Sequence, residues 1–440
     1  MTTTAQEGDA GRPGFGRGLG RPVRAVQRHV GAFFTNPTNV LGVILLAALG
    51  LRSIWLWVPE GQLIFDEAYY VNAARVLLGE EVGAGAKYHG APLGLDPNHE
   101  HPPLGKVLIA GSMLLFGDGG VGWRLPSLIA SMVALAAVYG IVRGVGETAW
   151  LGTLAVGLFA ADNLALVHSR IGTLDMLALA PLLVGAWLAT QQRWALAGIA
   201  CAVGSLVKLT GAFGLLALLI LQVFALTSTW RRTRRLGFDD LRPALLMTSA
   251  YGVVAIGGLW LLDLVFTAYR DPWAHLGHMM AFGSRLQAPE GPTGIASNPW
   301  QWLVNEVQIN YMRVGETVRS NGEVIATRPR IDFRGALNPA LIGALPLAFL
   351  FTGWLAVRRR SRLAVWAMVW AAANYLPFYV LVILSHRITY LYYFLPVVPA
   401  LAIAVALLLR RARLPDTVTW GYLAVVAAGF AAYFPFRRLP

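Results

Sequence analysis

Long apolar runs separated by short polar segments are the main pattern along this chain. Runs near 20 residues, about the length that a helix needs to cross a bilayer, recur from residue 40 to residue 434. They lie at 40–58, 124–142, 148–162, 172–190, 194–210, 211–229, 244–266, 337–357, 363–384, 389–409 and 417–434. The pattern predicts an all-α polytopic membrane protein with about eleven transmembrane helices.

Two longer segments, residues 59–123 and 267–336, interrupt this series. In the first, residues 67–78 place apolar side chains at helical spacing and stop before Gly79. A second helix is expected over residues 101–116, beginning with prolines that suit a first turn. Because about 14 residues is short for a span, we expect two helices that lie on the membrane surface.

Composition supports a membrane protein and narrows its partners. With 56% hydrophobic and only 13% charged residues, the chain has too little polar surface for a soluble globule of 440 residues. The net charge of +13 falls mostly between the apolar runs, where topology and anionic headgroups explain it, so no nucleic-acid partner is expected. Cys201 is the single cysteine and excludes an internal disulfide framework.

Residues 1–35 are rich in Gly, Arg and Thr and are expected to form a disordered basic tail, followed by one transmembrane domain over residues 36–440. No cleavage signal follows the first apolar run, so it is expected to remain as an uncleaved span. The tail is predicted to be cytoplasmic.

Arginine clusters give an independent test of topology, because cytoplasmic loops carry the excess of Lys and Arg. With the predicted spans, one face receives Arg143, Arg193 and the clusters at 231–235, 358–362 and 410–413. Arg437 and Arg438 do not fit this alternation. The two long segments, 59–123 and 267–336, therefore fall on the outer face of the cell membrane, and the chemistry is expected there.

The acidic pair Asp66-Glu67 directly follows the first apolar run and is the strongest catalytic candidate. A carboxylate at this position can act as a general base. A structural alternative is that Asp66 caps the following helix and that Glu67 complements its dipole. Both interpretations fit the sequence.

Further ionisable residues lie near or within the apolar runs, where charges are costly and normally pair or face a polar cavity. These are Asp162, Arg170, Asp175, Lys208 and Arg387. A structural alternative has Arg170 pairing loosely with Asp175 while Lys208 extends to the interface. Placement at a functional cavity is the favoured interpretation.

An ordered set of motifs in this chain resembles the motifs of protein O-mannosyltransferases. These enzymes belong to the GT-C superfamily of multi-span glycosyltransferases. The similarity covers nearly all of the chain after residue 35. The motifs are Asp66-Glu67, His101-Pro102-Pro103-Leu104-Gly105-Lys106, Trp123-Arg124-Leu125-Pro126, Ser169-Arg170 with Leu174-Asp175, Lys208-Leu209-Thr210-Gly211, Ser297-Asn298-Pro299-Trp300 and Arg387 through Pro396. Tyr393 stands where those enzymes tend to have a histidine, and no insertion is large enough for the β-trefoil domain of eukaryotic relatives.

The resemblance implies a GT-C fold and the transfer of a sugar, expected to be mannose, from a polyprenyl-phosphate carrier to a hydroxyl group of an exported protein. Asp66 would be the base and Glu67 would orient it or the acceptor. Arg387 would hold the lipid phosphate through its planar guanidinium. Other candidates for binding substrate or lipid phosphate are Arg170, Lys208, His101, Lys106, Asp162, Asp175, Tyr393 and Trp300. A single displacement would invert the anomeric centre.

Several alternatives remain at this level. The acceptor could be a lipid or a cell-envelope glycan, as in the related aminoarabinose transferases. A transporter of lipid-linked sugar would also need charges near the membrane, but it should show inverted repeats, and none is found. A non-catalytic scaffold would not need the acidic pair. No metal-binding motif is found; Asp66, Asp162 and Asp175 are the candidate ligands for a divalent cation.

Overall fold

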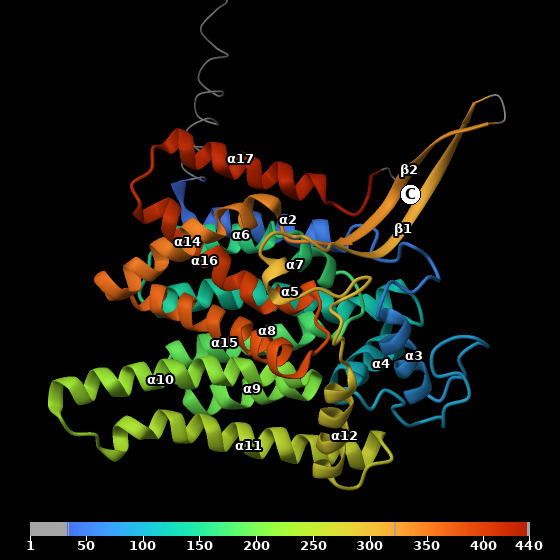
Figure 1. The fold of residues 1–440 in the computed structure, drawn as a ribbon, viewed down its shortest axis with the longest axis horizontal. Coiled ribbons are helices and arrows are strands. Elements are labelled where there is room, and N and C mark those ends of the chain that lie inside the picture. The colour runs from blue at the N-terminus through green and yellow to red at the C-terminus, as the bar shows by residue number, and fades with distance from the viewer. Residues whose placement is uncertain (1–32, 34, 321–322, 438–440) are drawn as a thin grey trace, which may run out of the picture.

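The computed structural model describes residues 33, 35–320 and 323–437 of the chain. Apart from residues 33 and 35, the predicted tail at 1–35 lies outside the described residues, as does Arg438. Most of the remaining chain is helical, and the long helices run roughly parallel to one another as a bundle (Figure 1).

Within the described part of the chain, six helical segments are long and apolar enough to cross a membrane. They are α5 (Gly120–Gly144), α10 (Ala212–Thr233) with its preceding turn, α11 (Phe238–Phe266), α14 (Pro339–Arg358), α15 (Arg362–Ser385) and α16 (Val398–Arg411) with its preceding turn. The remaining predicted spans coincide with shorter helices: α2 (Pro37–Ser53), α6 (Ala149–Ala160), α8 (Leu174–Thr190), α9 (Trp194–Val207) and α17 (Asp416–Ala432). Each predicted segment is thus a helix, and six meet the length criterion for a span.

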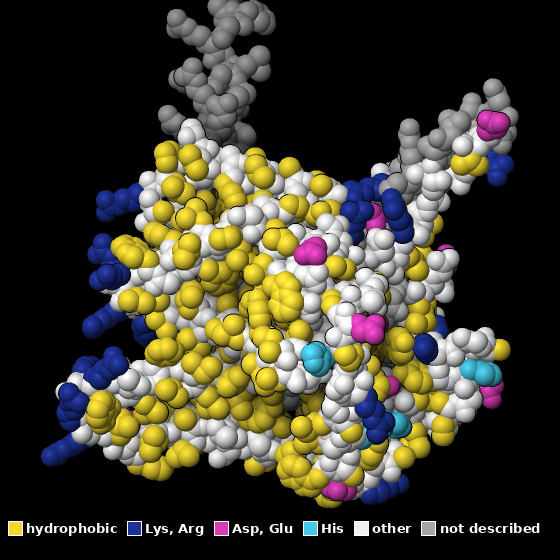
Figure 2. Space-filling model, in the orientation of Figure 1, with side chains coloured by type: hydrophobic (Ala, Val, Ile, Leu, Met, Phe, Trp, Pro, Cys, Tyr) yellow, Lys and Arg dark blue, Asp and Glu magenta, His cyan; other side chains and the backbone are white. Residues whose placement is uncertain are grey.

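Several basic loops lie together at one end of this bundle, and Figure 2 shows further basic side chains at the opposite end. Dark blue side chains collect where α10 joins α11 and where α14 joins α15 (Figures 1 and 2). Arg411, at the end of α16, reaches Glu147 in the α5–α6 loop at 2.5 Å, which places these two basic loops side by side. The two long segments at 59–123 and 267–336 contribute most of the opposite end.

Two short helices form the first of these long segments, as expected from the sequence. They are α3 (Glu67–Leu77) and α4 (Leu104–Phe116), and their apolar faces share one core with Trp123 and Leu174. The far face of α4 leaves Leu114 and Leu115 more than 70% exposed. This distribution suits a helix that lies at the surface of a membrane.

A two-stranded β-hairpin in the second long segment was missed by the all-α prediction. Strands β1 (Ile309–Ser320) and β2 (Glu323–Gly335) pair antiparallel and project away from the bundle (Figure 1). Tyr311 and Phe333 are buried at the base of the hairpin. The backbone N–H of Asp332 also donates to the Pro435 carbonyl, so the end of the chain fixes the base of β2.

Five further short elements complete the described chain: α7 (Asn163–His168), η1 (Leu209–Gly211), α12 (Pro272–Arg285), α13 (Pro299–Trp302) and η2 (Leu391–Val397). Helix α12 lies beside the end of α11, next to α4 and away from the basic end of the bundle (Figure 1). Elements α7, η1 and η2 each interrupt the apolar helices with polar residues. Several residues of the candidate site lie in or beside them: His168 ends α7, Lys208 directly precedes η1, and Tyr392 and Tyr393 lie in η2.

Candidate active site

Asp66 occupies the turn just before α3, but its side chain does not cap the helix. Its backbone is helical, with φ −69° and ψ −5°, and no cap hydrogen bond is formed by the carboxylate. The preceding residue, Phe65, has φ +54° and stacks on Tyr311 of β1, with ring centroids 4.4 Å apart. The capping interpretation of Asp66 is therefore wrong, and the packed turn holds a carboxylate that is not used by its own helix.

The surroundings of Asp66 suit a base that works near neutral pH. Burial raises the pKa of this carboxyl to about 7, the negative charge of Asp175 adds to the increase, and the positive charge of Lys208 opposes it. A base with a pKa near the working pH combines a large deprotonated fraction with a strong affinity for the proton. Asp66 therefore has the properties of a general base.

Glu67, its neighbour, is fully buried and used by the fold. Its oxygens accept hydrogen bonds from the Arg124 guanidinium at 2.8 and 3.0 Å. They also accept from the backbone N–H groups of Ile64 and Gly172 at 2.7 and 2.8 Å. Glu67 thus ties the Asp66 turn to α5 and to the α7–α8 loop, and it can position Asp66 without contacting a substrate.

Asp175 and Lys208 form the polar pair beside Asp66. The Lys208 ammonium lies 2.6 Å from the Asp175 carboxylate, at the start of α8 and the end of α9. It also lies 5.1 and 5.3 Å from the ring centroids of Tyr392 and Tyr393. The loose pairing of Arg170 with Asp175 proposed from sequence is therefore wrong, because Lys208 takes that place.

Two residues near this pair were not among the sequence candidates. Buried His168 lies 2.8 Å from the Tyr311 hydroxyl through Nε2 and 3.7 Å from the Asp175 carboxylate through Nδ1. Tyr311 comes from the missed hairpin. Alternation of buried Ile309 and Tyr311 with Asn310 is the sequence signal that could have indicated a strand here.

His101 is a further residue of the candidate active site. Its ring lies 5.9 Å from the ring of Tyr70 in α3. Burial lowers the pKa of His101 well below its ordinary value, and the positive charges of Lys208, Lys106 and Arg387 lower it further. The imidazole is therefore neutral at physiological pH and can share a site with cations.

Arg387 lies close enough for its charge to act on both His101 and Tyr390. Its guanidinium donates to the backbone carbonyl of Gly283, near the end of α12. Tyr390, a few residues on, stacks on Tyr392 with ring centroids 5.3 Å apart. Arg387 is thus part of the same neighbourhood as Asp66 and Lys208.

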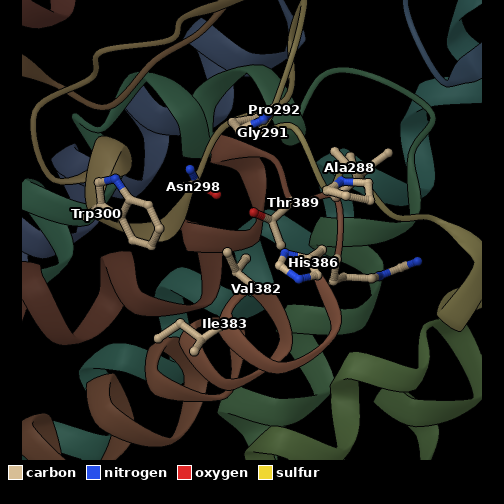
Figure 3. A pocket seen from close by; sticks show the side chains of 12 residues that line it. Ala288, Gly291, Pro292, Asn298, Trp300, Val382, Ile383, His386 and Thr389 are labelled. Carbon is tan, nitrogen blue, oxygen red and sulfur yellow. The ribbon is translucent and has the colours of Figure 1, made fainter.

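A cavity of about 240 Å³ lies against Arg387 at the end of α15. Figure 3 shows Trp300 and Asn298 on one side, Thr389 and His386 on another, and Val382 and Ile383 from α15 below them. The cavity therefore combines polar groups with an apolar wall. Trp300 belongs to this cavity rather than to the immediate surroundings of Asp66.

Lys106 is committed to the fold. Its ammonium is buried and lies 2.7 Å from Asp96, 2.7 Å from the Asn98 carbonyl and 2.8 Å from the His101 carbonyl. Three donors are thereby used. Lys106 therefore fixes the segment that carries His101, and its ammonium does not point toward a ligand.

Arg170 and Asp162 lie outside the group around Asp66. The Arg170 guanidinium donates to the carbonyls of Leu51 and Ile54, both at 2.5 Å, at the C-terminal end of α2. A helix end of this kind compensates a buried cation. The Asp162 carboxylate accepts from the backbone N–H groups of Ala165 and Asn338. Both residues fix helix ends.

The three carboxylates considered for a divalent cation are divided by this arrangement. Asp66 and Asp175 share one neighbourhood, and Asp162 does not join them. In residues 35–320 and 323–437, no group of three or more His, Cys, Asp or Glu side chains is arranged to hold a metal ion. Dependence on a divalent cation stays a prediction from the sequence.

Comparison with known families supports the motif-based resemblance. A family model described as dolichyl-phosphate-mannose-protein mannosyltransferase matches residues 100–247. This region contains His101, Asp175 and Lys208. It therefore includes three of the residues that the fold gathers near Asp66.

Curated relatives agree with this match. A polyprenol-phosphate-mannose–protein mannosyltransferase of Mycobacterium tuberculosis is 32% identical over 138 residues, which is 31% of this chain and 25% of the relative. The chain thus matches about a quarter of the length of that relative. A Corynebacterium glutamicum protein of the same name is 26% identical over an alignment of 435 residues, covering 83% of this chain and 82% of the relative.

Solved structures share the fold. The Saccharomyces cerevisiae protein O-mannosyltransferase Pmt1-Pmt2 complex bound to the sugar donor matches with a TM-score of 0.66 at 11% identity, over 91% of this chain and 90% of the other. ArnT from Cupriavidus metallidurans bound to undecaprenyl phosphate matches with a TM-score of 0.51 at 20% identity, over 89% and 63%. The chain has the GT-C glycosyltransferase fold, and its resemblance to this superfamily is confirmed.

Proposed function

We propose that this protein is a membrane glycosyltransferase that moves a sugar from a polyprenyl-phosphate carrier to a hydroxyl acceptor on the outer face of the cell membrane. The sugar that fits best is mannose and the acceptor is a Ser or Thr hydroxyl of an exported protein. The observation that carries this proposal is the Asp66 carboxylate, which does not cap α3 and lies within reach of the positive charge of Lys208.

The reaction needs few parts, because the lipid phosphate is already a good leaving group. Asp66 removes the proton from the acceptor hydroxyl while that oxygen attacks the anomeric carbon. The bond from this carbon to the phosphate oxygen breaks, and the lipid phosphate leaves with the electron pair. One displacement at carbon inverts its configuration.

Positive groups on the other side of the site would stabilise the departing phosphate. Lys208 is held by Asp175 at 2.6 Å, and Arg387 is held by the Gly283 carbonyl, so both cations are oriented before a substrate binds. Donors fixed in advance stabilise developing charge without a further reorganisation. Neutral His101, whose pKa is lowered by burial and by the charges of Lys208, Lys106 and Arg387, adds an N–H donor to the site.

Support for the donor comes from the relatives. The yeast complex is bound to its sugar donor, the ArnT structure holds undecaprenyl phosphate, and the curated relatives are named for polyprenol-phosphate-mannose and protein. Support for the outer face comes from the basic end of the bundle, which lies away from α3, α4 and α12. By the same charge rule the N-terminus is cytoplasmic.

The deciding experiment uses purified protein in liposomes with radiolabelled polyprenyl-phosphate mannose and a membrane extract as the source of acceptors. We expect label in protein that is released as mannose by β-elimination. Label in lipid or glycan would support a glycosyltransferase with a different acceptor. Movement of intact donor across the bilayer without cleavage of the sugar–phosphate bond would show that the protein is a transporter and not a glycosyltransferase.

A further inference from the structure

A buried pair at the junction of α11 and α12 has no part in the candidate site described above. The Nδ1 atom of His275 lies 2.7 Å from the Asp263 carboxylate, and both side chains are fully buried. Thr267 also donates to this carboxylate, at 3.3 Å. Buried polar groups of this kind are expensive to maintain, so their partners indicate what they hold in place.

The other ring nitrogen of His275 connects this pair to the first outer segment. Nε2 lies 3.2 Å from the backbone carbonyl of His99. A carbonyl oxygen only accepts hydrogen bonds, so Nε2 carries a proton and donates it. His275 therefore joins Asp263 of α11 to the segment that leads into His101.

Aromatic packing fixes the orientation of the His275 ring. Tyr269 stacks on it, with centroids 4.4 Å apart and an interplanar angle of 3°. The ring of His99 in turn packs edge-on against Tyr269 at 5.4 Å. Rotation of the imidazole, which would break its two hydrogen bonds, is prevented by these neighbours.

The two contacts of α12 reach the segment that carries His101 and the side chain of Arg387. Near its start, His275 bonds the carbonyl of His99, two residues before His101. Near its end, the carbonyl of Gly283 accepts from the Arg387 guanidinium. One short helix thus contacts the backbone beside His101 and the side chain of Arg387.

We propose that His275 is a positioning residue, which fixes α12 so that His101 and Arg387 are held at the spacing needed to bind the phosphate of the lipid-linked donor. This inference rests on the proposed function and deepens it. Loss of the His275 bridge would let α12 and the His99 segment separate. Donor binding would weaken, while Asp66 and the acceptor side would be unaffected.

Steady-state kinetics of His275→Gln test the proposal, with His278→Gln as the matched control. Glutamine can donate to the His99 carbonyl or to Asp263 but cannot reproduce both contacts. His278 is exposed on the same helix and meets His99 and Tyr269 through ring contacts only, so it controls for the loss of an aromatic ring. We expect the donor KM of His275→Gln to rise about tenfold, as for the loss of one hydrogen bond, with kcat at saturating donor and acceptor KM within about twofold. His278→Gln should match the wild type.

A second substitution separates positioning from general damage to the fold. In a background that carries both His101→Ala and Arg387→Ala, adding His275→Gln should raise the donor KM by less than about twofold, because both positioned groups are already gone. Multiplication of the two effects would overturn the proposal, as would an unchanged donor KM in folded His275→Gln protein. If that variant does not fold, Asp263→Asn should give the same increase in donor KM, and an unchanged value would equally overturn it.

Hydrogen exchange gives a measurement that does not depend on catalysis. Faster exchange in His275→Gln is expected over residues 96–104 and 272–285, with α5 and α16 unchanged. Identical exchange in wild type and variant would reject the positioning role even if the wild type transfers no sugar. Absence of transfer by the wild type, together with faster exchange in the variant, would reject the proposed function and leave the bridge itself in place.

Discussion

Glu67 and Arg124 form a buried, two-pronged ion pair, with Nε to Oε1 at 2.8 Å and Nη2 to Oε2 at 3.0 Å. The same arginine donates to the carbonyls of Leu56, Val58 and Gln62, which belong to the segment leading to Asp66. The pair therefore builds the turn that presents Asp66. Of the two adjacent acidic residues, Glu67 stabilises the fold and Asp66 belongs to the candidate active site.

The first prediction concerns this ion pair. Glu67→Ala leaves the Arg124 guanidinium buried without its carboxylate, and breaking such a pair is expected to destabilise the protein by about 3–5 kcal/mol. We expect a large fall in the yield of folded protein and in thermal stability. Size-exclusion profiles and thermal unfolding in detergent measure this. A variant as stable as the wild type but inactive would instead make Glu67 a catalytic residue.

The second prediction compares two arginines that the sequence presents as equivalent. Arg387→Lys keeps the charge but loses the planar fork, so the donor KM should rise at least about tenfold while stability is unchanged. Arg170→Lys should lower thermal stability, since lysine lacks the planar fork whose two nitrogens bond the Leu51 and Ile54 carbonyls separately, and should leave the activity of each folded molecule intact. Kinetics on matched amounts of folded protein distinguish the two. A rise in donor KM for Arg170→Lys, with none for Arg387→Lys, would place the phosphate-binding site at Arg170 instead of Arg387.

The sequence predicted the helices well because apolar runs near 20 residues are typical of helices that cross a membrane. It also identified Asp66, Asp175, Lys208 and Arg387, since charges at membrane level are rare. It could not separate these from Lys106 and Arg170, whose partners are largely backbone carbonyls. Backbone acceptors leave no pattern in a sequence.

The hairpin and His275 were missed for different reasons. Strands β1 and β2 alternate apolar and polar residues only near their base, within a long polar segment that offered no other strand signal. His275 lies on a short helix among other histidines, and its partner Asp263 ends an apolar helix. Its importance comes from contacts with His99, which only the folded chain brings near.

The third prediction tests the topology. With Cys201 replaced by Ala, single cysteines at Ala84, Thr293 and Thr233 all occupy exposed positions. Those at Ala84 and Thr293 should react with a membrane-impermeant maleimide in intact cells, whereas one at Thr233, in the basic α10–α11 loop, should react only after permeabilisation. Labelling of Thr233→Cys in intact cells would reverse the assignment of the outer face.

The fourth prediction concerns pH. Since the pKa of Asp66 is raised to about 7, the deprotonated base is lost as the pH falls through that value, and the transfer rate should fall with it. The native state holds this proton more tightly than the unfolded chain. The stability that Asp66 contributes is therefore complete below its ordinary pKa of 3.8 and is lost as the pH rises to about 7. A transfer rate that does not change between about pH 5.5 and about pH 8 would exclude Asp66 as the base.

The last prediction separates catalysis from structure at Asp66 itself. Asp66→Asn preserves the size of the side chain, and no cap hydrogen bond is at risk, because the carboxylate makes none to α3. The substitution also removes a buried charge, so at pH 8 the variant should be at least as stable as the wild type. It should still bind polyprenyl-phosphate sugar, since Lys208 and Arg387 remain.

Transfer by Asp66→Asn, however, should be undetectable with any acceptor, because an amide cannot accept the hydroxyl proton. Donor binding, thermal unfolding and transfer measured on one preparation give the result. Glu60→Gln, at an exposed position in the segment that leads to Asp66, is the matched control for the loss of a carboxylate in this region. If Asp66→Asn transfers sugar as fast as the wild type, Asp66 is not the base, and the glycosyltransferase mechanism proposed for this site is wrong.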